Sequence, residues 1–421
     1  MNPATMARPR QAVILSGGRG TRLGDIGKQM PKAMVPFGNH PFLGYLLCSL
    51  KEQGFERVLL LLGYKADQII EYCGDGARFG LQIDYSVSAV DDDTGRRVKL
   101  AEAKLDPVFL LMYCDNYWPL AFDRMWANFE DGQALAQVTV YRNRDSYTRD
   151  NLRVGADGLV EIYDKTRKAA DLSGVDIGFL ILNRDVLARL PEGENVSFEA
   201  HLYPQLVADR QLRAFETDHR YYSVGTPERL TETERFLTRG PCVILDRDGV
   251  LNAKQPKGTW VTSVDQWHWL PGALDGLARL TRAGAQIVVV TNQAGIARGG
   301  LRAEDLAKIH GRMCEESQAH GGAISAIYHC PHGWDSSCDC RKPKPGMLFQ
   351  AQRDHALKLD VTPFVGDDDR DGIAASAAGC PFLQVNPELG LAQAVDPLLE
   401  FLARAAEKNF GRSVETCQIV S

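Results

Sequence analysis

Two aspartates separated by one residue open the second half of the chain. Val243-Ile244-Leu245 is an apolar, strand-like run, and Asp246 and Asp248 follow it in Asp246-Arg247-Asp248-Gly249. On an extended segment, residues i and i+2 face the same way, so two carboxylates repel each other there unless a cation or a reaction requires them. One carboxylate that attacks phosphorus beside another that transfers a proton would split phosphoester hydrolysis into two steps. A surface turn is the competing interpretation.

Three further motifs favour the reactive interpretation because they stand near the ends of later strand-like segments. Thr291-Asn292-Gln293 ends a second strand, Arg341-Lys342-Pro343 follows a loop, and Gly366-Asp367 ends a third strand, with Asp371 four residues on. In order and position, the motifs resemble those of the haloacid-dehalogenase-like phosphatases. The resemblance covers about residues 241–386 and is much more specific than any single motif.

This resemblance implies a role for each motif. Asp246 would be the nucleophile and Asp248 the general acid/base, while Thr291 and Lys342 would hold the phosphoryl oxygens. The resemblance also implies a Mg²⁺ ion bound by Asp246, by the carbonyl of Asp248 and by Asp367.

Four side chains that bind metals lie within eleven residues, namely Cys330, His332, Cys338 and Cys340. Three thiolates and one imidazole match a closed, tetrahedral structural zinc site. Followed at once by Arg341 and Lys342, the pattern resembles the zinc loop of the heptose bisphosphate phosphatases and the related histidinol phosphatases. It implies a structural Zn²⁺ that braces the loop presenting Arg341 and Lys342 to the substrate. His329 is an alternative ligand, although it falls in a strand-like stretch.

Two more segments resemble the heptose enzymes. Asn252 follows Asp248-Gly249-Val250-Leu251, and the other segment is Thr291–Gly299. Through this resemblance, we expect the substrate to be bound by Asn252, Asn292, Arg298 and Arg341.

A glycine-rich turn follows the first strand-like segment of the chain, in Ser16-Gly17-Gly18-Arg19-Gly20-Thr21-Arg22-Leu23. Its glycines let backbone N–H groups approach an anion closely, and Arg22 and Lys32 add the positive charge that a polyphosphate needs. A simple link between a strand and a helix is the competing interpretation. The turn lacks the Walker lysine and does not match the dinucleotide fingerprint.

With Pro31-Lys32 after it, the turn resembles the signature of the sugar-1-phosphate nucleotidylyltransferases, over roughly residues 10–238. The resemblance implies that Gly17, Gly18, Gly20 and Thr21 bind the nucleotide and that Arg22 and Lys32 are catalytic. It also implies that Asp115, after the strand-like Val108–Tyr113, binds Mg²⁺. Lys165 would contact the sugar phosphate, and Gly178 would admit the sugar ring.

The sequence departs from that family at two places. Where the family has a second metal-binding Asp, before Gly225-Thr226-Pro227, this chain has Ser223. The usual sugar loop reads Asp91-Asp92-Asp93-Thr94-Gly95-Arg96. Serine is a weak, neutral ligand, so we expect a lower metal affinity, with Asp91–Asp93 as an alternative source of carboxylates.

Alternating apolar and amphipathic segments must position these residues, which is the pattern of α/β proteins. The predicted strands are 12–15, 58–62, 82–86, 108–113, 137–141, 177–182, 243–246, 286–291, 324–329, 363–366 and 382–385. The predicted helices are 41–53, 66–73, 227–238, 272–283, 303–319, 347–358, 372–378 and 389–407. Gly240-Pro241 breaks the chain between a helix and a strand. We therefore predict two α/β domains, a Rossmann-like nucleotidyltransferase domain over 1–239 and a haloacid-dehalogenase-like Rossmannoid domain over 240–421.

Composition excludes several classes of protein. The chain has 421 residues, 44% hydrophobic and 24% charged, which rules out disorder, collagen-like repeats and coiled coil. No apolar run approaches a membrane span, and the polar segment Met1–Arg10 does not resemble a signal peptide. The net charge of −6, with dispersed Lys and Arg, argues against duplex nucleic acid. Ten cysteines are too few for a disulfide scaffold, so we expect a cytoplasmic protein. We expect its partners to be small molecules.

Two sugar-phosphate domains in one chain favour consecutive steps on one metabolite. We expect a D-glycero-D-manno-heptose 1,7-bisphosphate 7-phosphatase joined to a heptose-1-phosphate nucleotidyltransferase that uses GTP or ATP. One alternative is a histidinol- or other sugar-phosphate phosphatase with a degenerate first domain. Another is a first domain that only binds a nucleotide sugar and regulates the phosphatase. The sequence leaves the base, the anomer and the oligomeric state open.

Overall fold

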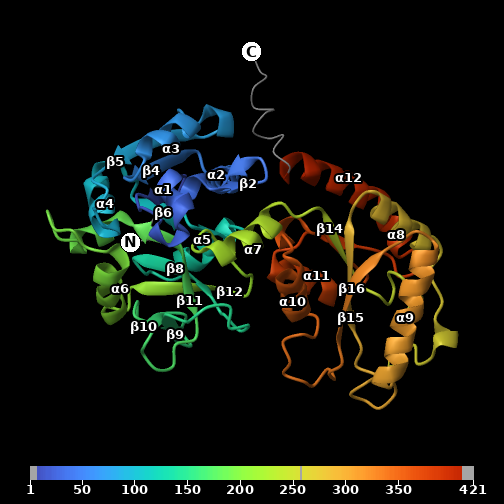
Figure 1. Ribbon diagram of the computed structural model, residues 1–421. Helices are drawn as coiled ribbons and strands as arrows, with labels where there is room; N and C mark the ends of the chain where they lie inside the picture. Colours follow the sequence, from blue (N-terminus) through green and yellow to red (C-terminus); the bar gives the residue numbers. More distant parts are fainter. Residues whose placement is uncertain (1–6, 257, 410–421) are drawn as a thin grey trace. The chain divides into compact units, whose positions relative to one another are not determined.

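The computed structural model describes residues 7–256 and 258–409 (Figure 1). Within them, the chain divides into two compact units, the first ending at Leu237 and the second beginning at Thr238. This division lies close to the predicted break near residue 240. Residues 1–6, at the start of the polar Met1–Arg10 segment, and residues 410–421, assigned to the second domain, lie outside the described residues.

A seven-stranded mixed sheet forms the centre of the first unit, in the order β12-β8-β11-β6-β1-β4-β5. The central strand β1 pairs in parallel with β4 and β6, whereas β11 runs antiparallel to both of its neighbours. The strands of the sheet are β1 Gln11–Ser16, β4 Arg57–Leu62, β5 Gln82–Val87, β6 Val108–Tyr113, β8 Ala136–Tyr141, β11 Val175–Asn183 and β12 Leu212–Thr217. Three small sheets join β2 Pro36–Phe37 with β3 His40–Pro41, β7 Asn116–Tyr117 with β13 Tyr222–Ser223, and β9 Leu152–Val154 with β10 Val160–Tyr163.

Helices cover this sheet because alternate side chains of its strands point to opposite faces. Val13 and Leu15 of β1 share one face, and they belong to a core with Val98 and Leu202 from the covering helices. Helices α4 and α6, which carry those two residues, lie side by side (Figure 1). The helices of this unit are α1 Asp25–Gln29, α2 Phe42–Glu52, α3 Ala66–Cys73, α4 Thr94–Leu100, α5 Phe122–Glu130, α6 Phe198–Ala208 and α7 Pro227–Leu237.

The second unit is built on a fully parallel, five-stranded sheet in the order β16-β15-β14-β17-β18. Its strands are β14 Cys242–Leu245, β15 Gln286–Asn292, β16 Ile324–Cys330, β17 Phe364–Gly366 and β18 Phe382–Gln384. Its helices are α8 Ala273–Arg282, α9 Ala303–Ala319, α10 Gly346–His355, α11 Asp369–Ala378 and α12 Leu391–Asn409. Parallel strands end at a common edge, so residues that follow β14, β15 and β17 are brought together there.

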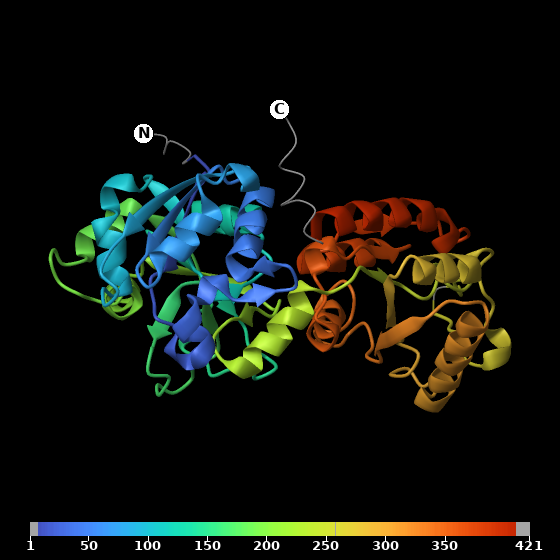
Figure 2. The ribbon, with the colours of Figure 1, turned by 45° about the horizontal axis from the view of Figure 1, so that its top comes forward.

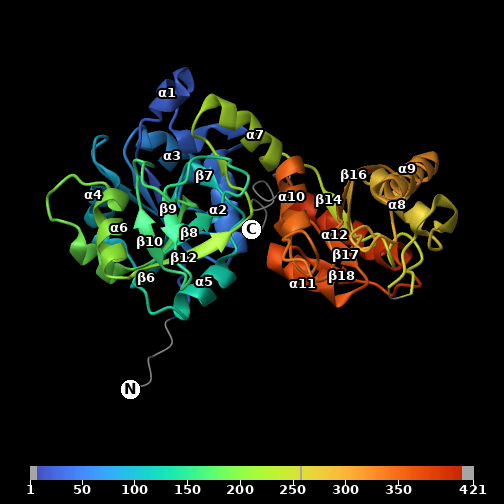
Figure 3. The same ribbon diagram turned by 90° about the horizontal axis from the view of Figure 1, so that it is seen from below.

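Period-two alternation divides the apolar residues of this sheet between two cores. Val243 and Leu245 belong to one core, with side chains from α8, α9 and α12, and α12 lies along α8 (Figure 2). Ile244 belongs to the other core, with side chains from α10 and α11, on the opposite side of the sheet (Figure 3). Burial on both faces explains why β14 is apolar throughout.

The α/β prediction is confirmed, and each predicted strand and helix overlaps an element of the structure. The prediction missed β12, the short strands of the three small sheets, and the helices α1, α4, α5 and α6. β12 lacks the regular alternation of a half-buried strand, because Ala214 and Phe215 stand together, as do Glu216 and Thr217. α6 contains Pro204, which is atypical of a helix interior. No helix in the described part of the chain combines the length and the apolar character needed to cross a bilayer.

Candidate active sites

The second unit gathers its predicted catalytic residues at the carboxyl edge of its sheet. Asp246 directly follows β14, Thr291 lies near the end of β15, and Asp367 directly follows β17. A cavity of about 480 Å³ opens at this edge, and its lining includes Asp246, Asp248, Thr291, Asn292, Arg341, Lys342 and Asp367. The four motifs are therefore brought to one cavity.

Lys342 lies between two carboxylates at the floor of this cavity. Its Nζ is 2.8 Å from Asp246 Oδ1 and 2.7 Å from Asp371 Oδ1, and it also donates to the carbonyl of Val290 at 3.0 Å. Burial alone would lower the pKa of Lys342, but the two carboxylates hold it above its ordinary value. Burial raises the pKa of Asp246 to about 7, Lys342 opposes that rise, and Asp371 adds to it. The ammonium is thus a fixed charge beside the candidate nucleophile.

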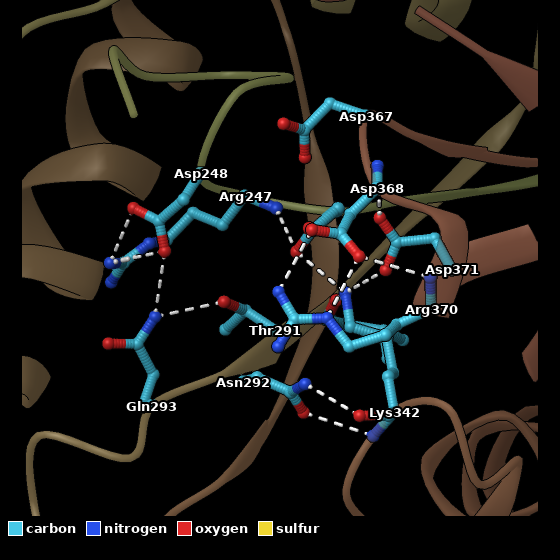
Figure 4. Close-up of polar contacts among 12 residues, drawn as sticks. Arg247, Asp248, Thr291, Asn292, Gln293, Lys342, Asp367, Asp368, Arg370 and Asp371 are labelled. Carbon is cyan, nitrogen blue, oxygen red and sulfur yellow. Dashed lines mark hydrogen bonds and ion pairs between the residues drawn. The ribbon is translucent and has the colours of Figure 1, made fainter. Parts of the chain in front are cut away.

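Asp248 is oriented by three donors, of which Arg247 and Gln293 are labelled in Figure 4. Arg247 donates to both of its oxygens, at 2.9 and 3.0 Å, and Asn252 donates to Oδ1 at 3.0 Å. Gln293 Nε2 lies 3.0 Å from Asp248 Oδ2 and 2.9 Å from Thr291 Oγ1. Burial alone would raise the pKa of Asp248, but Arg247 and the other donors hold it below its ordinary value. The carboxylate is therefore ionised and able to accept a proton.

Three hydrogen bonds fix the loop that carries Lys342. The side chain of Asn292 donates to the Lys342 carbonyl and accepts from the Lys342 N–H, both at 3.1 Å. Arg341 donates to the His332 carbonyl at 3.3 Å. The Asn292 side chain is thus used in bracing the loop, although its predicted role was to bind substrate.

Three carboxylates near Lys342 could hold a cation. Ligand atoms of Asp246, Asp367 and Asp371 all lie within 4.8 Å of one another. Asp367 Oδ1 is buried without a hydrogen-bond partner, and its Oδ2 contacts Lys254 Nζ at 2.5 Å. A buried carboxylate oxygen with no donor is what a missing cation would leave. Gly249, at φ +84°, is required here because a Cβ would lie 2.6 Å from the Asp367 carboxyl carbon.

The second candidate metal group in the described chain is the predicted thiol–imidazole set, Cys330, His332, Cys338 and Cys340. Cys340 Sγ lies 3.3 Å from Cys330 Sγ and 3.2 Å from His332 Nδ1. Cys330 Sγ lies 3.8 Å from Cys338 Sγ. The alternative ligand His329 is outside this group, because its neighbour Cys330 points to the buried side of β16 while His329 is exposed.

The first unit has its own cavity, of about 310 Å³, at the carboxyl end of β1. Its lining includes Gly17, Gly18, Gly20, Thr21, Arg22, Lys32 and Asp115. Lys32 Nζ lies 3.2 Å from Asp115 Oδ2. The structure therefore brings together the glycine-rich turn, its two predicted cations and the predicted metal ligand.

Ser223 lies beside Asp115 through the backbone. It pairs with Asn116 across β13 and β7, and the Val224 N–H donates to the Asp115 carbonyl at 2.8 Å. Asp92 and Asp93 line the same cavity, whereas Asp91 pairs with Arg19 at 3.0 Å. Two carboxylates of the altered sugar loop are thus near the cavity, but Asp115 belongs to no group of three ligands among the described residues.

Lys165 and Gly178 lie outside the lining of this cavity. Lys165 Nζ contacts Ser197 Oγ at 2.7 Å and Glu199 Oε2 at 3.6 Å. A Cβ on Gly178 would lie 3.0 Å from the ring of Tyr113, which does line the cavity. Gly178 is therefore packed against Tyr113, whereas the Lys165 side chain is more than half exposed.

Comparison with known proteins shows which families the two units belong to. Residues 11–240, more than half of the chain, match the family Nucleotidyl transferase, and residues 242–377 match the family Polynucleotide kinase 3 phosphatase. The D-glycero-beta-D-manno-heptose-1,7-bisphosphate 7-phosphatase of Bordetella bronchiseptica is 46% identical over 138 residues, 33% of this chain and 76% of that protein. The chain belongs to both the nucleotidyl transferase and the heptose bisphosphate phosphatase families.

Two further relatives match one unit each. The phosphatase of the same name from Pseudomonas aeruginosa is 40% identical over 158 residues, 38% of this chain and 88% of that protein. The crystal structure of HddC from Yersinia pseudotuberculosis is 26% identical, covers 54% of this chain and 98% of its own, and has a TM-score of 0.48. We call the first unit the transferase unit and the second the phosphatase unit; the chain is an enzyme with both.

Sequence reasoning missed one residue in each unit. The sequence motifs imply no role for Asp371 of the phosphatase unit, although it contacts Lys342. Arg97 of the transferase unit is 4% exposed, lines the cavity, and donates to the carbonyls of Leu62, Ala89 and Val90 at 2.7–2.9 Å. An arginine on an amphipathic helix usually faces solvent, so the helical pattern does not predict that Arg97 is buried. The one signal in the sequence is its position directly after the altered, charged sugar loop.

Proposed function

We propose that the chain is a bifunctional enzyme of nucleotide-activated heptose biosynthesis. Residues 240–421 would be a D-glycero-D-manno-heptose 1,7-bisphosphate 7-phosphatase, and residues 1–239 a heptose-1-phosphate nucleotidyltransferase using GTP or ATP. The observation that carries the proposal is the presence in one chain of a phosphatase cavity built around Asp246 and Lys342 and a second cavity built on the glycine-rich turn. Membership of the two families supports the same pairing.

In the phosphatase reaction, a carboxylate oxygen of Asp246 attacks phosphorus, and the bond to the sugar oxygen breaks. Asp246 Oδ1 already accepts from Lys342 and from the Arg247 N–H at 2.7 Å, which makes Oδ2 the candidate attacking oxygen. Asp248 gives a proton to the leaving oxygen and then removes one from the water that hydrolyses the aspartyl phosphate. A bound phosphate dianion raises the pKa of Asp248 and so favours the protonated form that the first step needs.

Metal ions complete the proposed phosphatase unit. The orphaned oxygen of Asp367 and the nearby Asp246 fit a Mg²⁺ site, to which the Asp248 carbonyl would also contribute. Bound there, Mg²⁺ would offset the charge of the phosphoryl group. The set of three cysteines and one histidine fits a structural Zn²⁺.

In the transferase reaction, an oxygen of the sugar 1-phosphate attacks the α-phosphorus of the nucleotide, and pyrophosphate leaves. The backbone of Gly17, Gly18, Gly20 and Thr21 would hold the phosphates, and Arg22 and Lys32 would offset the charge that develops on them. Asp115 would share Mg²⁺ with the nucleotide. Lys165 and Gly178 would serve the sugar end.

One observation favours a second candidate, a phosphatase whose first unit only binds a nucleotide sugar. Ser223 replaces an acidic ligand beside Asp115, and both candidate metal groups of the described chain lie in the phosphatase unit. In either case we propose a cytoplasmic enzyme of small molecules, because ten cysteines among 421 residues are too few for the disulfide scaffold of a secreted protein.

The deciding experiment supplies the full-length protein with heptose 1,7-bisphosphate, a panel of NTPs and Mg²⁺, and follows phosphate and pyrophosphate separately. Release of both, with pyrophosphate appearing after phosphate, supports the bifunctional enzyme. Phosphate without pyrophosphate from any NTP supports the binding-domain candidate. Hydrolysis of histidinol phosphate in preference to the heptose substrate contradicts both heptose assignments.

A further inference from the structure

An exposed tryptophan stands on the wall of the phosphatase cavity. Trp334 lies between His332 and Cys338 in the candidate zinc loop, and its side chain is 52% exposed. Among the described residues, the other large exposed hydrophobic side chains are Val87, Leu100, Ile373 and Leu389, and none of these lines the cavity. An indole left open to solvent beside catalytic groups is a surface that a ligand can cover.

Contacts on both sides of the loop hold Trp334 in place. The Arg298 guanidinium carbon lies 3.6 Å from the centre of the indole ring, a cation–π contact that fixes the plane of the ring. The turn that carries Arg298 is tied to the zinc loop because the Ala297 N–H donates to the Pro331 carbonyl at 3.2 Å. Trp334, and not Arg298, is among the residues that line the cavity. Arg298 is therefore placed to support the indole rather than to meet the substrate directly.

A second indole lines the same cavity. Trp260 packs over the turn after β15, where a Cβ on Gly295 would lie 2.9 Å from its ring and a Cβ on Gly300 would lie 3.0 Å from it. The floor holds Asp246, Asp248 and Lys342, which can take the reacting phosphate. The cavity has a volume of about 480 Å³, which is more than a phosphate ion fills. With the phosphate bound at the floor, the organic part of the substrate lies between Trp260 and Trp334.

We propose that Trp334 binds the C–H face of the sugar ring and so selects ring-form sugar phosphates over acyclic phosphate monoesters. A pyranose presents several C–H bonds on one face, and these meet the electron-rich face of an indole favourably while covering its apolar surface. A short acyclic phosphate has no such face. The inference rests on the proposed phosphatase function and adds to it the residue that recognises the sugar.

The test compares phosphate release from heptose 1,7-bisphosphate and from sn-glycerol 3-phosphate by the full-length protein. Trp334→Ala should lower kcat/KM for the heptose substrate about tenfold, mostly through KM, and leave the glycerol substrate unchanged. Trp334→Phe should restore most of the loss. Leu389→Ala, which shortens an equally exposed side chain away from the cavity, should match wild type on both substrates.

Zinc content is measured for every variant, so that a damaged loop is recognised. Equal losses on both substrates for Trp334→Phe and Trp334→Ala would show a purely structural role and overturn the inference. So would unchanged kinetics on both substrates. Failure of the proposed function looks different, because wild type itself would then show no preference for the heptose substrate over glycerol phosphate.

Discussion

Arg97 occupies the space directly against Gly17: a Cβ on Gly17 would lie 2.3 Å from Arg97 Cζ. Gly18, in contrast, has nothing within 4 Å of its added Cβ. Gly17→Ala should therefore lower pyrophosphate release at least tenfold and destabilise the transferase unit by about 1–3 kcal/mol through overpacking. Gly18→Ala is the matched control and should keep wild-type stability in urea unfolding.

A double-mutant cycle identifies Arg97 as the cause. If the clash is with Arg97, the stability cost of Gly17→Ala should largely disappear when Arg97→Ala is already present. The same cost in both backgrounds would show that the glycine is needed for another reason, such as the approach of the nucleotide.

Asp246→Asn should reduce phosphate release to below about 1% of wild type, because the amide keeps the volume of the side chain but loses the attacking oxygen. Pyrophosphate release by the same protein, supplied directly with heptose 1-phosphate and NTP, is the internal control and should not change. A variant that hydrolyses heptose bisphosphate at a rate near wild type would remove Asp246 from the role of nucleophile.

Elemental analysis should find about one zinc per chain in freshly purified protein, held by the four-residue thiol–imidazole group. Cys338→Ser should lose most of this zinc and depress phosphatase activity, because the bound loop leads directly to Lys342. Cys314→Ser, at a half-buried cysteine outside the group, should keep both. Protein that is active and free of zinc would refute the assignment.

Ser223→Asp should lower the Mg²⁺ concentration that gives half-maximal pyrophosphate release, by several-fold, because it adds a charged oxygen beside Asp115. Wild type should need unusually high Mg²⁺ or prefer Mn²⁺, and Asp115→Ala should abolish the reaction. The Mg²⁺ dependence of phosphate release serves as the control. Saturation of wild type at ordinary Mg²⁺, unchanged in Ser223→Asp, would contradict the one-carboxylate site.

Acid should destabilise the transferase unit through His219. Burial lowers the pKa of His219 to about 4, and its Nδ1–H donates to the Arg220 carbonyl at 2.8 Å. The unfolded chain takes up this proton near pH 6.5, so stability is lost as pH falls from about 6.5 towards about 4. At pH 5 the loss should be about 2 kcal/mol.

The variant His219→Asn keeps an N–H group that can donate to the Arg220 carbonyl, but its side chain does not take up a proton in this pH range. Between pH 7 and pH 5, urea unfolding of this variant should therefore lose less stability than wild type. His268→Asn, at an exposed histidine, should follow wild type. Equal losses in all three proteins would mean that His219 does not control this acid sensitivity.

The sequence predicted those features that depend on local patterns. The strand β14 and the acids after it were predictable, because a fully buried parallel strand reads as an apolar run. The thiol–imidazole group was predictable because its ligands are close in sequence. The contact between Asp371 and Lys342 joins segments far apart in the chain, and only packing reveals it. Arg97 was hidden for the same reason, since its acceptors are carbonyls of Gly17, of Leu62 at the end of β4, and of Ala89, which are far apart in the sequence.

Asp371 carries two duties in one carboxyl group. Its Oδ1 contacts Lys342, while its Oδ2 accepts the Asp368 N–H at 3.2 Å and closes the capping box of α11. Selection for a well-formed helix and selection for turnover therefore act on the same side chain. A substitution that removes the Asp371 carboxyl group loses both the contact with Lys342 and the helix cap. Activity and stability therefore cannot be exchanged for one another in small steps at this position, as they can at most surface sites.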